Sequence, residues 1–176
     1  MIERIIIAGS GGQGIMLLGK VLAEAAMLEN RFVTWLPSYG AEVRGGTAHC
    51  MVAVSDKEIG SPYIAQADSL IIMNAPSLEK FKSRVKKVSL WVINSSLAKP
   101  DNIKGGSILQ HPFTDLALGL GNIKVANILA LGCFLKYKQL VRLDTVSSVI
   151  KKFAPAGKEE LIRINEQALR KGAELR

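Results

Sequence analysis

Apolar and polar residues follow one another along the chain in blocks that predict strands and helices in turn. Residues 5–8 form a short apolar run that stops at Gly9 and is typical of a buried strand. From residue 14 to residue 29 the apolar positions, among them Leu18, Val21 and Leu22, recur at helical spacing. The first part of the chain therefore predicts a strand, a glycine-rich turn and a helix.

Similar blocks continue towards the C-terminus. The pattern predicts further strands at 31–36, 48–54, 70–73 and 88–93, and Pro37 is expected to stop the first of these. It predicts helices that begin near Asn74, at 122–137 and at 158–174, while the section around residues 105 and 106 is weakly patterned. This alternation favours an α/β fold of three α/β/α layers, with a mostly parallel, Rossmann-like sheet and a glycine-rich first βα turn. We expect residues 1–176 to form a single domain.

Composition narrows the class of protein. The chain has 176 residues, 48% of them hydrophobic, which is enough for one domain with a sizeable core. The longest apolar run, near 127–135, is far shorter than a membrane span, and the opening MIERIIIAG lacks the layout of a signal peptide. We therefore expect a cytoplasmic protein with no membrane contact. Cys50 and Cys133 are the only cysteines and form no CxxC motif, so neither a disulfide framework nor a metal site is expected.

The formal net charge of +8 favours anionic partners. The densest basic run has only Phe81 as an interleaved aromatic ring, which is too little for a base-stacking platform, so no nucleic-acid partner is expected. We predict that this run forms a solvated helix face and turn: Lys80, Lys82, Arg84, Lys86 and Lys87.

The stretch GSGGQGIMLLGK at 9–20 fits two phosphate-binding patterns, of which at most one can be correct. A P-loop is excluded because residues 15–18 are apolar and helical, and because Val21 occupies the place of the hydroxyl that would bind magnesium. A dinucleotide fingerprint fits better, yet residues 34–37 contain no acid to bind a ribose. Two interpretations stay open: a turn that binds an anion, and glycines that serve only a tight turn.

A second unusual stretch, PSYGAEVRGGTAHC, lies between the second and third predicted strands. Arg44 stands among glycines, where a guanidinium can fork onto a carboxylate or a phosphate. The alternative is a surface pair between Arg44 and Glu42. His49 lies on a predicted strand, where we expect a structural role.

Four spaced motifs resemble those of one known family. GSGGQG, PSYGAEVRGGTAHC, IGSPYI followed by ADSLIIMNAPSLEKF, and LGNIKVANILALG are together similar to the gamma subunit of the 2-oxoacid:ferredoxin oxidoreductases, which include enzymes for pyruvate, ketoisovalerate and 2-oxoglutarate. MNAPSLEKF and LGNIKVAN most resemble the 2-oxoglutarate enzymes.

The resemblance implies a subunit of an enzyme that oxidatively decarboxylates a 2-oxoacid, makes an acyl-CoA (succinyl-CoA from 2-oxoglutarate) and reduces ferredoxin. The implied partners are alpha, beta and possibly delta subunits, which would hold thiamine diphosphate, Mg²⁺ and iron–sulfur clusters and would contact ferredoxin. This chain has neither a cysteine cluster nor the G-D-G motif of thiamine diphosphate sites, so no cofactor and no catalytic residue is expected on it.

The resemblance also implies a role in the coenzyme A site. The expected binding residues are Gly9, Gly11, Gly12, Gln13, Gly14, Lys20, Tyr39, Arg44, Gly45 and Gly46. The glycine turn would offer backbone N–H groups to the CoA phosphates, with Lys20 reaching back from about 9 Å further along the helix. Arg44 would either complete this site or anchor the subunit. The alternatives are a purely structural subunit and a stand-alone reductase that binds NAD or FAD.

Overall fold

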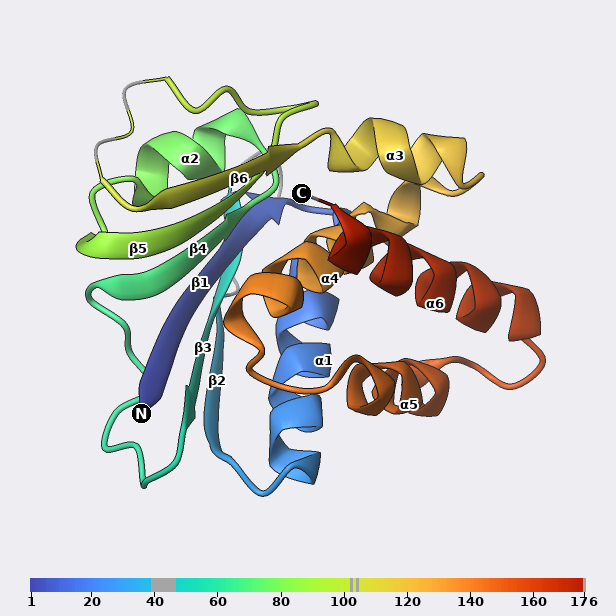
Figure 1. Cartoon of the computed structure of the whole chain (residues 1–176), viewed down its shortest axis with the longest axis horizontal. Helices are drawn as coiled ribbons and strands as arrows, with labels where there is room; N and C mark the ends of the chain where they lie inside the picture. The colour runs from blue at the N-terminus through green and yellow to red at the C-terminus, as the bar shows by residue number, and fades with distance from the viewer. Residues whose placement is uncertain (39–46, 102, 104, 176) are drawn as a thin grey trace.

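The computed structural model describes residues 1–38, 47–101, 103 and 105–175 (Figure 1). The elements follow in the order β1 (Ile2–Ser10), α1 (Ile15–Leu28), β2 (Phe32–Ser38), β3 (Thr47–Ser55), β4 (Ala67–Ile72), α2 (Ala75–Phe81), β5 (Val85–Asn94), β6 (Ser107–His111), α3 (Phe113–Gly119), the 3₁₀ turn η2 (Ile123–Val125), α4 (Ala126–Lys138), α5 (Leu143–Phe153) and α6 (Glu159–Glu174).

The strands form one mixed sheet in the order β2-β3-β1-β4-β5-β6. Strands β1, β4, β5 and β6 are parallel, whereas β3 runs antiparallel to both of its neighbours, β1 and β2. The prediction of a mostly parallel sheet in an α/β fold is therefore confirmed. The carboxyl ends of β1, β4 and β5 meet at one edge of the sheet, and the glycine turn lies at that edge.

Strand β1 is central, and its apolar run is buried from both sides. Ile5 and Ile7 face a core that includes α1 and α4, while Ile6 and Ala8 face a second core that includes α2. All four side chains are inaccessible to solvent. Burial on both faces explains why this strand is apolar without alternation.

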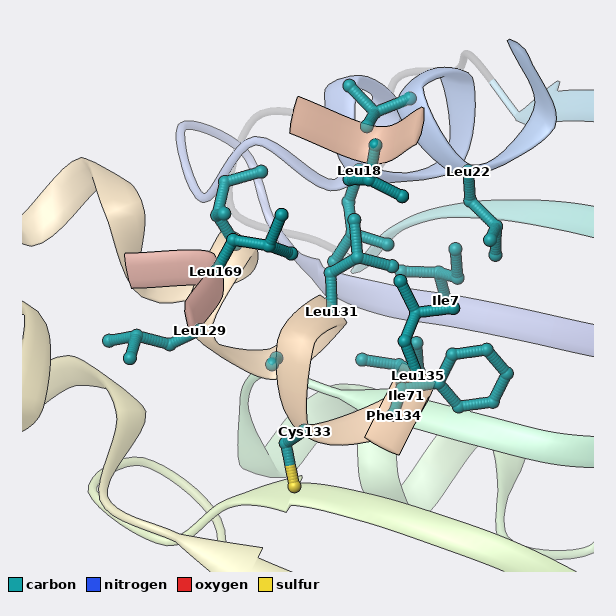
Figure 2. Close-up of a cluster of buried hydrophobic side chains, with 14 of the residues drawn as sticks. Ile7, Leu18, Leu22, Ile71, Leu129, Leu131, Cys133, Phe134, Leu135 and Leu169 are labelled. Carbon is teal, nitrogen blue, oxygen red and sulfur yellow. The ribbon is translucent and has the colours of Figure 1, made fainter. Parts of the chain in front are cut away.

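The first ten residues of α4 are apolar on all sides except at Asn127, because protein surrounds them. Its residues 126–135 are buried without interruption. Figure 2 shows side chains from five elements in one cluster: Ile7, Ile71, Leu18, Leu22, Leu129, Leu131, Phe134, Leu135 and Leu169. The sheet and α1 lie on one side of α4, and α6 covers another (Figure 1). An enclosed helix of this kind has no polar stripe.

Pro37 does not stop the second strand, contrary to the prediction. Strand β2 continues to Ser38, and Pro37 is paired with Cys50 of β3. Proline is tolerated because β2 is the edge strand of the sheet, where a missing N–H group need not break the ladder.

Helix α2 begins as predicted. The Asn74 side chain accepts a hydrogen bond from the N–H group of Ser77 at 3.1 Å, and Pro76 lies in the first turn. The helix at 122–137 is divided into η2 and α4, and the C-terminal helix is α6. Strand β6 and helices α3 and α5 were not predicted.

Residues of the basic run make more contacts with the rest of the fold than the prediction of a solvated helix face and turn implies. Arg84 donates to the carbonyl of Ile64 and lies over the ring of Tyr63, 5.3 Å from its centroid. Lys86 pairs with Asp68. Phe81 is fully buried, so its ring is not available for base stacking.

Candidate functional site

The glycine turn connects β1 to α1, and two of its glycines adopt backbone angles that favour glycine. Gly12 has a φ angle of +87° and Gly14 one of +70°. A Cβ atom at Gly9 would lie 2.6 Å from the Oε1 atom of Gln13, too close for any side chain. The sequence GSGGQG therefore suits this local conformation specifically.

Gln13 ties the turn to the neighbouring strand. Its Oε1 atom accepts a hydrogen bond from the Ser10 N–H group at 2.7 Å, and its Nε2 atom donates to the Met73 carbonyl at 3.2 Å. Met73 follows β4 directly. The side chain of Gln13 is thus engaged in holding the turn, and the donors left for a ligand are backbone N–H groups.

The Met73 carbonyl also joins the end of β5 to the turn. The buried Asn94 donates to it at 3.1 Å and to the Thr114 hydroxyl at 2.9 Å. Through Gln13 and Asn94 the carboxyl ends of β1, β4 and β5 are linked by side-chain amides. These hydrogen bonds hold the turn against the carboxyl ends of β4 and β5.

Helix α1 presents unpaired N–H groups at the turn. The first N–H groups of any α-helix lack partners within the helix, and they carry the positive end of its dipole. α1 has neither a capping side chain nor an acidic residue in its first turn. A hollow of about 330 Å³ lies here, lined by Ser10, Gly11, Gly12, Gly14, Ile15, Met16, Leu17, Ser38 and Ala48. The arrangement is suited to an anion.

A second, smaller hollow of about 130 Å³ is lined in part by Gly12 and Gln13. It extends to Leu97 after β5, to Thr114 in α3 and to Lys124 in η2. Lys124 lines this hollow together with Gly12 and Gln13, and its place beside the turn was not anticipated from the sequence.

The strand order argues against a dinucleotide site. In a Rossmann fold the ribose-binding acid stands at the end of the second strand, which lies beside the first. Here the antiparallel β3 separates β2 from β1. The carboxyl end of β2 is therefore displaced from the glycine turn by one strand, in addition to having no acidic residue.

Lys20 is not brought to the turn. Its ammonium group lies over the Phe153 ring, 4.8 Å from the centroid, against α5. Four other predicted site residues lie outside the described residues: Tyr39, Arg44, Gly45 and Gly46. The His49 ring packs on the Phe81 ring at 4.8 Å, as a structural histidine would.

The segment 9–17 contains no ionisable side chain, so its contribution to a site is backbone hydrogen bonding and not proton transfer. In the part of the chain that the structure describes, no three His, Cys, Asp or Glu side chains gather as a metal site. Nor is any helix among the described residues long and apolar enough to cross a bilayer.

Asn94 and Asn127 are the site residues that sequence analysis missed. Both are almost completely buried, and Asn127 donates to the Gly14 carbonyl at 3.0 Å. In the sequence, each is an amide residue in or beside a long apolar run. Such a position indicates a buried amide, and a buried amide needs specific hydrogen-bond partners.

The chain is similar to members of one family along nearly its whole length. Residues 4–175 match the family described as pyruvate ferredoxin/flavodoxin oxidoreductase. The chain is 37% identical, over 97% of its length, to ketoisovalerate oxidoreductase subunit VorA of Methanothermobacter thermautotrophicus, but spans only 36% of that protein. It is 31% identical to 2-oxoglutarate synthase subunit KorC of Methanocaldococcus jannaschii, over 91% of this chain and 88% of that one.

Two solved structures also resemble this chain over nearly its whole length. The keto/oxoacid ferredoxin oxidoreductase gamma subunit of Geobacter sulfurreducens has a TM-score of 0.82 and 25% identity, with 98% of this chain and 96% of that one covered. The 2-oxoglutarate:ferredoxin oxidoreductase of Magnetococcus marinus, solved with 2-oxoglutarate, coenzyme A and succinyl-CoA bound, has a TM-score of 0.88 and 25% identity, over 97% of this chain and 30% of that longer one. The chain belongs to the pyruvate ferredoxin/flavodoxin oxidoreductase family.

Proposed function

We propose that this chain is the gamma subunit of a 2-oxoacid:ferredoxin oxidoreductase, and that its glycine turn binds the phosphates of coenzyme A. The enzyme would convert a 2-oxoacid and CoA to an acyl-CoA and CO₂, passing two electrons to ferredoxin. Family membership and the likeness to gamma subunits support the subunit role.

The observation that carries the CoA assignment is the set of backbone N–H groups at the start of α1, which adjoin a hollow and meet no carboxylate in the first helical turn. CoA is rich in phosphate charge, and such a helix terminus stabilises an anion through both its N–H donors and its dipole. The likeness to a protein solved with CoA bound supports the same ligand.

The chemistry of the turn indicates which part of the reaction this chain would serve and which part its partner subunits would serve. Because the turn has no ionisable side chain, it binds and orients CoA while the reaction takes place on partner subunits. Those partners, alpha, beta and possibly delta, would hold thiamine diphosphate, Mg²⁺ and the iron–sulfur clusters. As part of this proposal, an α/β/α arrangement of three layers with a Rossmann-like sheet would leave the sheet edge that carries the turn open to the ligand.

Two substrates have support from the relatives. Our first choice is 2-oxoglutarate, because KorC matches this chain over most of both lengths. A branched-chain 2-oxoacid is the second, because the 37% identity is to a ketoisovalerate enzyme subunit. To decide between them, the tagged chain is used to recover the complex from its native host. The complex is then assayed with each 2-oxoacid in the presence of CoA and a viologen dye.

The CoA site is tested with a matched pair of substitutions, Gly12→Asp and Gly12→Asn, in the assembled complex. Gly12 has no neighbour within 4 Å of an added Cβ, and both replacements suffer the same backbone strain at φ +87°. They differ only in charge. A carboxylate beside the phosphates is expected to raise the KM for CoA roughly 10- to 100-fold over that of the Asn variant. Equal KM values would leave only the structural-subunit role.

The remaining predicted site residues need a separate test. Arg44→Ala raises the KM for CoA if Arg44 binds the ligand, whereas loss of partner subunits with normal CoA kinetics assigns Arg44 to the interface. Lys20→Ala tests whether the Lys20 ammonium group leaves the Phe153 ring and pairs with a phosphate of CoA. A chain that elutes alone and binds NAD or FAD tightly would overturn the proposed function.

A further inference from the structure

Asn127 is a polar residue in the most enclosed helix of the fold. Only 1% of its surface is exposed, and its neighbours in the first half of α4 are apolar. Both ends of its amide are used. The Oδ1 atom accepts from the Ile128 N–H group at 2.9 Å, and the Nδ2 atom donates across to the Gly14 carbonyl at 3.0 Å.

The second bond links α4 to the glycine turn across a long separation in sequence. The Gly14 carbonyl also accepts the first hydrogen bond of α1, from the Leu18 N–H group at 2.9 Å. Its position is therefore set by two donors from different elements. A Cβ atom on Gly14 would lie 2.4 Å from the Asn127 Nδ2 atom, so the amide fits against this position only because residue 14 is glycine.

Fixing this carbonyl also fixes a donor. The Gly14 carbonyl and the Ile15 N–H group belong to one planar trans peptide, in which the C=O and N–H bonds point in opposite directions. When Asn127 and Leu18 hold the oxygen on the helix side, the Ile15 N–H group must point away from the helix. Both Gly14 and Ile15 line the hollow at the start of α1.

We propose that Asn127 is a positioning residue for the anion site: it orients the peptide between Gly14 and Ile15 so that the Ile15 N–H group faces a bound phosphate. This inference rests on the proposed function, because the phosphate is that of CoA. Asn127 itself does not touch the ligand. Its effect passes entirely through the backbone of the turn.

The test compares the two ends of CoA as inhibitors of the assembled oxidoreductase. Adenosine 3′,5′-bisphosphate carries phosphates without the thiol arm, and pantetheine carries the thiol arm without phosphate. In Asn127→Leu, which keeps the branched shape of the side chain but cannot donate, the inhibition constant of the bisphosphate should rise about tenfold. The inhibition constant of pantetheine should stay within about twofold.

A matched control removes the same kind of bond elsewhere. Asn165 is a half-buried amide whose Nδ2 atom donates to the Leu161 carbonyl within α6 at 2.7 Å. Asn165→Leu should leave both inhibition constants unchanged. If the Asn127→Leu variant fails to assemble, Asn127→Ser is used in its place. The serine hydroxyl is too short to reach the Gly14 carbonyl, so this variant also lacks the hydrogen bond.

Each outcome separates the two proposals. If both inhibitors weaken together in the Asn127 variant, its role is merely structural and the inference is wrong. If neither changes although Gly12→Asp weakens CoA, the CoA site stands and the positioning role is lost. If Gly12→Asp and Gly12→Asn share one KM for CoA, the CoA-binding part of the proposed function fails and only the structural-subunit role remains.

Discussion

Replacing Gly172 with alanine tests how closely α4 and α6 are packed. The two helices approach so closely that a Cβ atom on Gly172 would lie 2.1 Å from the Leu129 carbonyl oxygen. Gly132 on the facing helix has the same relation to the Leu169 oxygen, also at 2.1 Å. Real Cβ contacts do not fall below 3.0 Å, so the backbones must separate by nearly 1 Å to admit one methyl group.

Two opposing terms set the size of the effect. Overpacking between well-packed elements costs about 1–3 kcal/mol, and the upper end applies because the obstacle is backbone, which cannot rotate away as a side chain can. Alanine gains at most about 1 kcal/mol of helix propensity over glycine. Gly172→Ala should therefore destabilise the fold by about 2 kcal/mol, a fall in Tm of about 4–8 °C for a chain of this length.

Differential scanning calorimetry of the purified chain measures the change. Gly119→Ala is the matched control, because Gly119 ends α3 with nothing within 4 Å of an added Cβ. Its Tm should stay the same or rise slightly. If Gly172→Ala also matches or exceeds the wild type, the two helices can separate freely and the close packing does not contribute to stability.

Three further predictions follow from buried polar and titratable groups. Burial raises the pKa of Glu29, but its hydrogen bonds, first among them one from the Thr145 hydroxyl at 2.6 Å, lower it more, and the net pKa lies below the ordinary value of 4.5. Glu29→Gln should therefore be less stable than the wild type above pH 4.5. This difference in stability should vanish as the pH falls through the lowered pKa, and urea unfolding at several pH values measures it. Burial raises the thiol pKa of Cys50 to about 12 and that of Cys133 to about 11, so iodoacetamide at pH 8 should label both only after unfolding; labelling of the native chain would contradict their burial. Asn74→Ala should cost about 1 kcal/mol through loss of the α2 cap, whereas Asn74→Ser should retain most of it, as judged by urea midpoints.

The sequence predicted those elements whose stability is local or whose burial is complete. β1 was recognised because burial on both faces demands a continuous apolar run, and the start of α2 because Asn74 caps it through its own side chain. The glycine turn was recognised because Gly12 and Gly14 adopt angles that other residues avoid. For α2 and the glycine turn the physical cause lies within a few residues of the pattern, whereas for β1 the apolar run records burial by elements distant in sequence.

What only the tertiary structure decided depends on partners distant in sequence. The antiparallel direction of β3 and the edge position of β2, which admits Pro37, are properties of sheet order and not of either strand. Leu109 is the one buried residue among the five of β6, so the strand has little apolar pattern of its own and is defined by its pairing with β5. The role of Asn127 is the clearest case: an amide in an apolar run predicts a buried partner, but only the packing of α4 against the turn shows that this partner is the Gly14 carbonyl. Hydrogen bonds between remote segments leave no periodicity in sequence, because the fold, and not the spacing, brings donor and acceptor together.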